Sequence, residues 1–117
     1  KALPEPGTTV IKEDAFINNG SLSMVIIADG VTGIDWGAFQ GCSRLISISI
    51  PDSLKHIGDY AFSECAGLTS ITIPDSVTHI GCKAFIECPN LMEISIHIEC
   101  SYYGSAFEDH TAITFRE

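Results

Sequence analysis

Apolar residues recur along this chain with a period far longer than that of a helix or a strand. An Ala-Phe pair at residues 15–16 returns at 38–39, 61–62 and 84–85, each time after 23 residues, and once more at 106–107 after 22. Such a period predicts a solenoid, because a unit this short buries no core alone and stacked units cover one another's open faces. Four further apolar columns keep the same spacing: Leu22, Leu45, Leu68 and Leu91; Val25, Ile48, Ile71 and Ile94; Ile27, Ile50, Ile73 and Ile96; Ile11, Ile34, Ile57 and Ile80.

Each repeat carries its own sequence of short elements. The pattern Leu-x-x-Ile-x-Ile predicts a strand, since its last two apolar residues alternate with polar ones, as in 71–73. Pro-Asp-Ser follows at 51–53 and 74–76 and predicts a turn. The β-rich segment 76–81 predicts a second, weaker strand on the opposite side of the coil, with a bend because Val77 and Ile80 are three residues apart. Segment 83–88 is too short for a stable helix and predicts a 3₁₀ turn that places the phenylalanines in one column.

The repeat at residues 68–88, from Leu68 through Pro74-Asp75-Ser76 and Ala84-Phe85 to Cys88, resembles the BspA-type (Treponema pallidum type) leucine-rich repeat. The resemblance covers about residues 8–107. It implies an α/β fold: a right-handed leucine-rich-repeat solenoid of about four to five repeats. A parallel sheet would lie on its concave side, with short second strands and 3₁₀ or helical turns. It also implies a secreted or cell-surface protein of a bacterium or protist, often an adhesin or host-interaction protein.

The ends of the chain depart from the repeat pattern. Residues 1–7 are expected to be a linker or a cut edge, and residues 8–117 a single leucine-rich-repeat domain. The turn at 97–103 is one residue short and lacks Pro-Asp-Ser. Segment 111–116 predicts a shortened last strand that closes the array as a cap, since terminal repeats need a more polar outer face. The alternative is that the chain was cut from a longer array.

Composition narrows the classes of partner. A content of 45% hydrophobic and 18% charged residues in a chain of 117 fits one folded domain. The net charge of −9, with only six Lys and Arg, argues against nucleic acid and against anionic membrane surfaces. Without an apolar run of 18 residues, membrane insertion is not expected. The sequence shows no signal peptide, so the chain is either mature or truncated.

Five cysteines are an odd number, so at least one is free or bonded to another molecule. Cys42, Cys65 and Cys88 recur at the repeat period at an inward position. We interpret them as small buried apolar side chains, because stacked side chains that run parallel do not suit a disulfide. Cys100 is also assigned to the core. Cys82 falls in a loop column and is expected to be exposed, and a Cys82–Cys100 disulfide is the alternative.

Two polar columns raise the question of metal binding. His56 and His79 share a column, but two imidazoles fall short of the three or four ligands of a zinc site, so we expect two exposed histidines. Asp29, Asp52 and Asp75 form a predicted ladder of carboxylates, the kind of ligand that Ca²⁺ takes, although Ca²⁺ needs six to eight oxygens. We interpret these aspartates instead as capping residues, each bonding the backbone of its own turn.

Nothing in the sequence indicates catalysis. It contains no Gly-x-Ser-x-Gly elbow, no phosphate-binding glycine loop and no Cys-x-x-Cys, so we expect neither an enzyme nor a cofactor. Glu64 and Glu87 predict a solvent-facing pair. Asn19 begins a formal glycosylation acceptor, Asn-Gly-Ser, yet it occupies the inward cysteine column and is expected to be buried and unmodified.

The outward positions of the first strand form the candidate binding face. Most are small and hydroxylated, and a few are large and apolar, which together suit a flat contact surface. The candidate residues are Met24, Ile26, Ile46, Ser47, Ser49, Thr69, Ser70, Thr72, Met92, Glu93 and Ser95.

The sequence therefore predicts a module that binds an extracellular protein or glycan through its concave sheet. Two other functions stay open: an inert spacer that holds another domain away from a cell surface, and an accessory module of a secreted enzyme. End-to-end self-association is a further expectation, because the strands at the ends of a solenoid carry unpaired backbone groups. Binding on the loops, or outside this fragment, is the alternative to the concave face.

Overall fold

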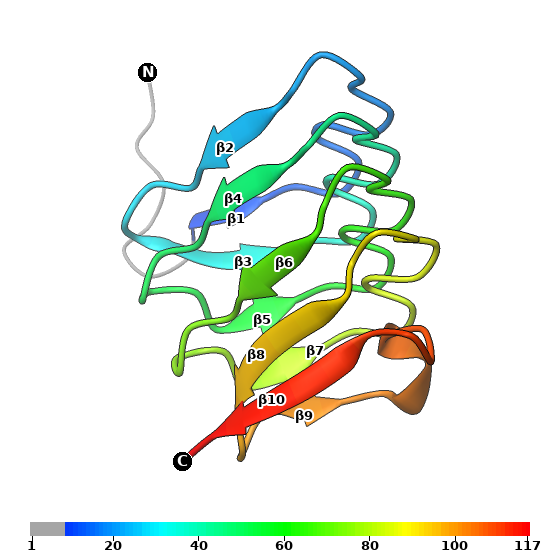
Figure 1. Cartoon of the computed structure of the whole chain (residues 1–117). Helices are drawn as coiled ribbons and strands as arrows, with labels where there is room; N and C mark the ends of the chain where they lie inside the picture. Colours follow the sequence, from blue (N-terminus) through cyan, green and yellow to red (C-terminus); the bar gives the residue numbers. More distant parts are fainter. Residues whose placement is uncertain (1–8) are drawn as a thin grey trace.

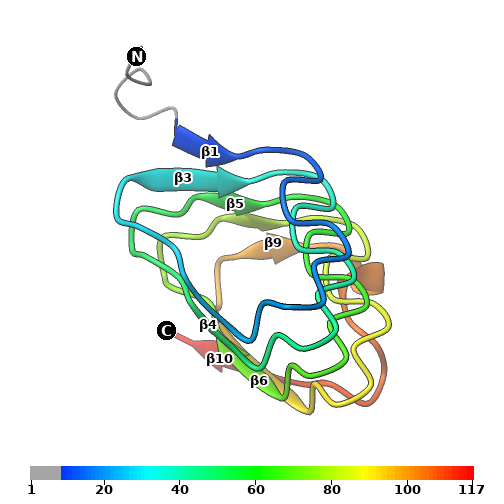
Figure 2. The same cartoon turned by 90° about the horizontal axis from the view of Figure 1, so that it is seen from above.

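The computed structural model describes residues 9–117, which wind into a parallel β-solenoid of about five coils (Figure 1). Seen from above, each coil has strands on two sides and tight turns on the third (Figure 2). The back sheet contains β1 (Thr9–Ile11), β3 (Val31–Ile34), β5 (His56–Ile57), β7 (His79–Ile80) and β9 (Ser101–Tyr102). The front sheet contains β2 (Met24–Ile26), β4 (Ser47–Ser49), β6 (Ser70–Thr72), β8 (Glu93–His97) and β10 (Ala112–Arg116).

The two sheets differ in continuity. The five back strands pair without interruption in the order β1-β3-β5-β7-β9. The front strands fall into two groups, β2-β4 and β6-β8-β10, and no strand pairing joins β4 to β6 within residues 9–117. The second strand of each repeat, predicted to be the weaker one, thus forms the unbroken sheet.

The third side is built from turns rather than from the helical elements implied by an α/β fold. Among residues 9–117 the only helix is η1, a 3₁₀ helix at Gly104–Ala106. In the other coils the backbone takes a left-handed conformation twice, four residues apart, as at Tyr60 and Glu64, with φ of 60° and 61°. These positive φ values end any helical run after a single turn.

Hydrogen bonds on this side alternate between two kinds of partner. Within a coil, Ala61 and Ser63 donate their N–H groups three residues back. The N–H group of Phe62, which lies between them, instead donates to Ala84 of the next coil at 2.8 Å. This alternation makes a third ladder that joins the coils at the turns as well as at the strands.

The core is a set of columns that run the length of the solenoid. The phenylalanine rings stack face to face, with centroids 5.2 Å apart between Phe16 and Phe39 and 5.3 Å apart between Phe39 and Phe62. The next two steps of the column, to Phe85 and then to Phe107, are 5.2 and 5.5 Å. The predicted stacking is therefore confirmed, and burying each inner ring contributes about 1.5–3 kcal/mol.

The bend expected between Val77 and Ile80 is also present. Both side chains are buried, although only Ile80 belongs to a strand, β7. Val77 instead closes the preceding turn, where its N–H group bonds the carbonyl oxygen of Pro74 at 3.1 Å. The linker expected at residues 1–7 lies outside the described residues.

Candidate binding surface

The front face consists of the outward side chains of β2, β4, β6, β8 and β10. Its columns follow the predicted register: Met24 pairs with Ser47, and Ser70 with Glu93. The last strand extends the face beyond the prediction, because Ala112 pairs with Glu93 and Thr114 with Ser95. All the predicted contact residues are exposed except Ser95, which is half-buried.

Four large apolar side chains stand on this face. The exposed fractions are 64% for Met24, 76% for Ile26, 61% for Ile46 and 55% for Met92. Met24 and Ile26 lie on β2, and Ile46 immediately precedes the adjacent strand β4, so these three side chains gather at one end of the face. Met92 stands apart, immediately before β8.

The face is hollowed where the front sheet is interrupted. A groove of about 440 Å³ lies between β4 and β6. Facing backbone groups of these two strands have no ladder partner there, so they remain available to a bound molecule. The groove is lined by residues 46–50 and 70–72. A smaller hollow of about 160 Å³ continues it between β6 and β8.

Arg116 closes the far end of the face. Its guanidinium group bonds the Asp75 carboxylate, with Nη2 at 2.8 Å and Nε at 3.1 Å from Oδ1. It also donates to the Ser95 hydroxyl and to the carbonyl oxygen of Ile73. One side chain of the last strand thereby ties two earlier coils together, and the predicted cap strand at 111–116 gains a specific anchor.

These repeats match the family model of the BspA type leucine rich repeat region over residues 9–115, in six copies. The chain belongs to the BspA-type leucine-rich repeat family. Among solved structures it is similar to a leucine-rich repeat protein of T. pallidum, with a TM-score of 0.83 and 31% identity. That match covers 87% of this chain and 48% of the other.

Two further structures share the fold. A leucine rich cell surface protein of Faecalibacterium prausnitzii gives a TM-score of 0.68 at 24% identity, covering 82% of this chain and 32% of that one. The pneumococcal vaccine antigen PcpA gives 0.77 at 23% identity, covering 94% and 29%. The present chain thus spans less than half the length of these proteins. No match is found among curated proteins.

The cysteines of this BspA-type chain are all free, so the Cys82–Cys100 disulfide is not formed. Cys65 and Cys88 donate their S–H groups to the carbonyl oxygens of Phe39 and Phe62, at 3.3 and 3.1 Å. Burial raises the pKa of the Cys88 thiol to about 11, and burial raises that of Cys65 further. Cysteine therefore recurs in the repeat as a small apolar residue that also satisfies a carbonyl of the preceding coil.

The aspartate ladder of the repeats does not cap its own turns as predicted. The turns close instead through the backbone, as where Leu54 N–H bonds the carbonyl oxygen of Pro51 at 3.1 Å. Asp75 is held by Arg116, a partner from a distant repeat that turn chemistry does not reveal. Residues 9–117 hold no group of three or more His, Cys, Asp or Glu side chains arranged for a metal ion.

The remaining polar predictions have mixed outcomes. His56 and His79 are neighbours on β5 and β7 and both are exposed, as expected. Glu64 and Glu87 are also exposed. Asn19 is half-buried rather than buried, because it lies in the first coil that the structure describes; its Oδ1 accepts the Ser21 N–H group at 3.0 Å. No helix in the described part of the chain is long and apolar enough to cross a membrane.

Proposed function

We propose that this chain is a protein-binding module of a larger secreted or cell-surface protein, and that its partner docks on the front face. The proposed cell-surface location is supported by two similar structures, which belong to a leucine rich cell surface protein and to a vaccine antigen. This is the face that the family resemblance assigns to the concave side.

The observation that carries the proposal is the cluster of Met24, Ile26 and Ile46 beside the groove between β4 and β6. A cluster of exposed apolar side chains on one rigid face marks a contact with another protein more often than it marks an ordinary solvent-facing surface. Their neighbours are hydroxyl side chains and unpaired backbone groups, which suit the polar rim of such an interface. Because the coils fix the backbone, ordering this surface on binding costs little.

The test is capture from a panel of purified extracellular-matrix and serum proteins by the immobilised chain. Ile46→Asp and Met92→Asp should each weaken capture by more than about tenfold, since a desolvated apolar contact becomes a buried charge. Ile98→Asp is the matched control, because Ile98 is 55% exposed but lies in the turn after β8.

Circular dichroism and the unfolding midpoint must stay unchanged in all three variants. Equal loss in the Ile98→Asp control would show that the front face has no special role. Capture of no protein by the unaltered chain would leave the inert spacer as the better function.

A further inference from the structure

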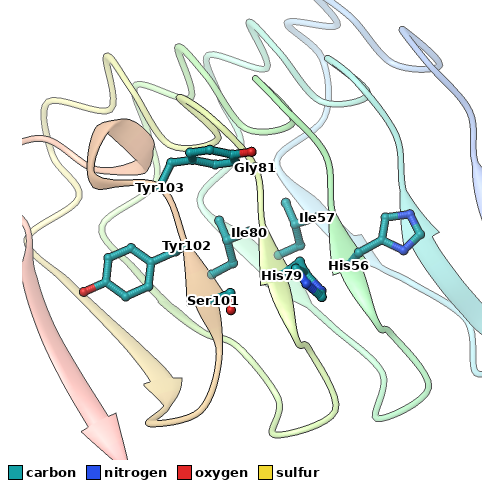
Figure 3. A pocket seen from close by; sticks show the side chains of 8 residues that line it. All are labelled: His56, Ile57, His79, Ile80, Gly81, Ser101, Tyr102 and Tyr103. Atoms are coloured by element: carbon teal, nitrogen blue, oxygen red, sulfur yellow. The ribbon is translucent and has the colours of Figure 1, made fainter.

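A second groove lies on the back sheet, away from the front face. It has a volume of about 410 Å³ and runs over β5, β7 and β9 (Figure 3). Its size falls within the range of small-molecule sites, which begins at about 300 Å³. The lining residues are His56, Ile57, His79, Ile80, Gly81, Ser101, Tyr102 and Tyr103.

None of the eight lining residues has a carboxylate, an ammonium or a guanidinium group. A charged ligand would therefore be desolvated here without a counter-charge, which is costly. The chain as a whole carries a net charge of −9, which further disfavours an anion. The groove consequently suits a neutral molecule.

Hydrogen bonds around Thr78 fix what His79 offers to such a molecule. The single hydroxyl proton of Thr78 is donated to the carbonyl oxygen of Lys55 at 3.2 Å. In that arrangement the 2.8 Å contact between Thr78 Oγ1 and His79 Nδ1 is donated by the imidazole. This assigns neutral His79 the Nδ1–H tautomer, with Nε2 as an acceptor that has no partner within residues 9–117.

Two polar groups that face the groove, the Ser101 hydroxyl and the Tyr103 hydroxyl, have no hydrogen-bond partner within residues 9–117. The His56 ring lies over Gly33 of β3, where a Cβ atom would stand 2.4 Å from its Cε1 and Nε2 atoms, and it points away from Ser101 and Tyr103 (Figure 3). Glycine at this position therefore makes room for the imidazole. The groove thus presents donors and acceptors that are all uncharged.

An aromatic surface completes the groove. Tyr103 is 62% exposed, and Figure 3 shows its ring at the Gly81 end of the groove. Ile57 and Ile80 lie beneath the groove as part of the core. A ligand ring that has an apolar face and many hydroxyl groups would match this combination of a tyrosine ring and neutral polar groups.

We infer that the back groove binds a neutral saccharide, with Tyr103 packing on the sugar ring and His79 and Ser101 bonding its hydroxyl groups. An apolar ligand would leave these polar groups unpaired. The site is independent of the front face, because the two sheets lie on opposite sides of the core (Figure 2).

The test is an NMR titration of isotope-labelled chain with neutral mono- and disaccharides of glucose, galactose, mannose and N-acetylglucosamine. Side-chain signals of His79 and Tyr103 should shift with saturation. Tyr103→Ala should weaken binding about tenfold. Tyr103→Phe and Ser101→Ala, which each remove a single hydroxyl, should weaken it about two- to fivefold.

Two controls separate this site from the front face. Ser70→Ala removes a hydroxyl from the front sheet, and Ile46→Asp disrupts the proposed protein contact, so neither should alter saccharide binding. The inference fails if no neutral sugar shifts the groove signals at tens of millimolar, if Tyr103→Ala binds as well as the unaltered chain, or if a sulfated disaccharide binds equally tightly.

Discussion

The front and back sheets of this solenoid come from the same repeats but differ in kind. The back strands β3, β5, β7 and β9 are two to four residues long and nevertheless form part of one unbroken sheet. The front strands carry the strongest sequence pattern, and yet pairing stops between β4 and β6. Strong apolar alternation therefore identifies which side chains are buried, but it does not ensure that neighbouring backbones pair.

The coils approach each other closely along part of the back sheet. Gly58 and Gly81 each follow a back strand, and each donates its N–H group to the preceding coil, at 2.7 and 2.8 Å. A Cβ atom at Gly81 would stand 2.5 Å from the backbone nitrogen of Asp59. The segment that leads into front strand β6 is less crowded, since a Cβ atom at Gly67 would stand 3.1 Å from the carbonyl oxygen of Leu45.

Replacing these glycines is expected to have the largest effect on stability. Gly81→Ala should lower the free energy of unfolding by about 3 kcal/mol, because rigid backbone must move to admit the methyl group. Gly67→Ala should cost about 1 kcal/mol or less, because its contacts are tight but not overlapping. Urea denaturation followed by circular dichroism measures both.

Gly104→Ala provides the reference, since no atom beyond its chain neighbours and its own helical turn lies within 4 Å of a Cβ atom built there. It should change stability by less than about 0.5 kcal/mol. If Gly67→Ala destabilised the chain as much as Gly81→Ala, close coil contact would not distinguish the two sheets.

Alkaline pH should destabilise the fold through Cys88, in the segment that leads into front strand β8. Cys88 lies three residues before Leu91 of the front side, and burial raises the pKa of its thiol from 9.0 to about 11. In the unfolded chain this thiol ionises near pH 9, whereas in the folded chain it stays protonated. Its contribution is therefore complete below pH 9 and is lost as the pH rises to about 11, by about 2 kcal/mol.

The unfolding free energy measured between pH 8 and 11 checks this loss. Cys88→Ala should make the decline in unfolding free energy shallower by the contribution of the Cys88 thiol alone, although the substitution lowers stability at pH 8. Cys82→Ala is the matched control, because this half-buried thiol lies on the other side of the turn, after β7. Identical slopes for the unaltered chain and Cys88→Ala would contradict the assignment.

Most of the fold can be predicted from the sequence because each buried or outward position recurs in several repeats. The Phe62 stack, the buried Cys65 and the outward register of Met24 with Ser47 all follow from one 23-residue period. The interruption between β4 and β6 does not follow, because Ser47 and Ser70 occupy the same column as other paired residues. Pairing depends on small displacements of the backbone, which residue types do not encode.

The two candidate sites also differ in how far sequence could predict them. The front face follows from simple alternation, and its binding role stays a prediction. The back groove depends on Tyr103, which enters through the shortened turn at 97–103, and on the Thr78 bond that orients His79. In the sequence, this region is marked only by the departure of one turn from the repeat and by residues that share a column, and neither feature predicts a groove.

The smallest expected effect concerns the turn that joins a back strand to the next front strand. Glu87 is exposed and has a φ of 58°. The equivalent residues in the two preceding coils are Glu64 and Gly41, and Gly41 has a φ of 75°. A left-handed conformation costs a non-glycine residue about 1 kcal/mol, and a glycine at this position avoids that cost. Part of this gain in stability is offset because glycine has greater conformational freedom in the unfolded chain. Glu87→Gly should therefore stabilise the chain by about 0.5 kcal/mol, measured as a shift of the urea midpoint at constant slope. Glu87→Ala removes the same charge but keeps the strain, so a midpoint equal to that of Glu87→Gly would assign the gain to charge instead of backbone.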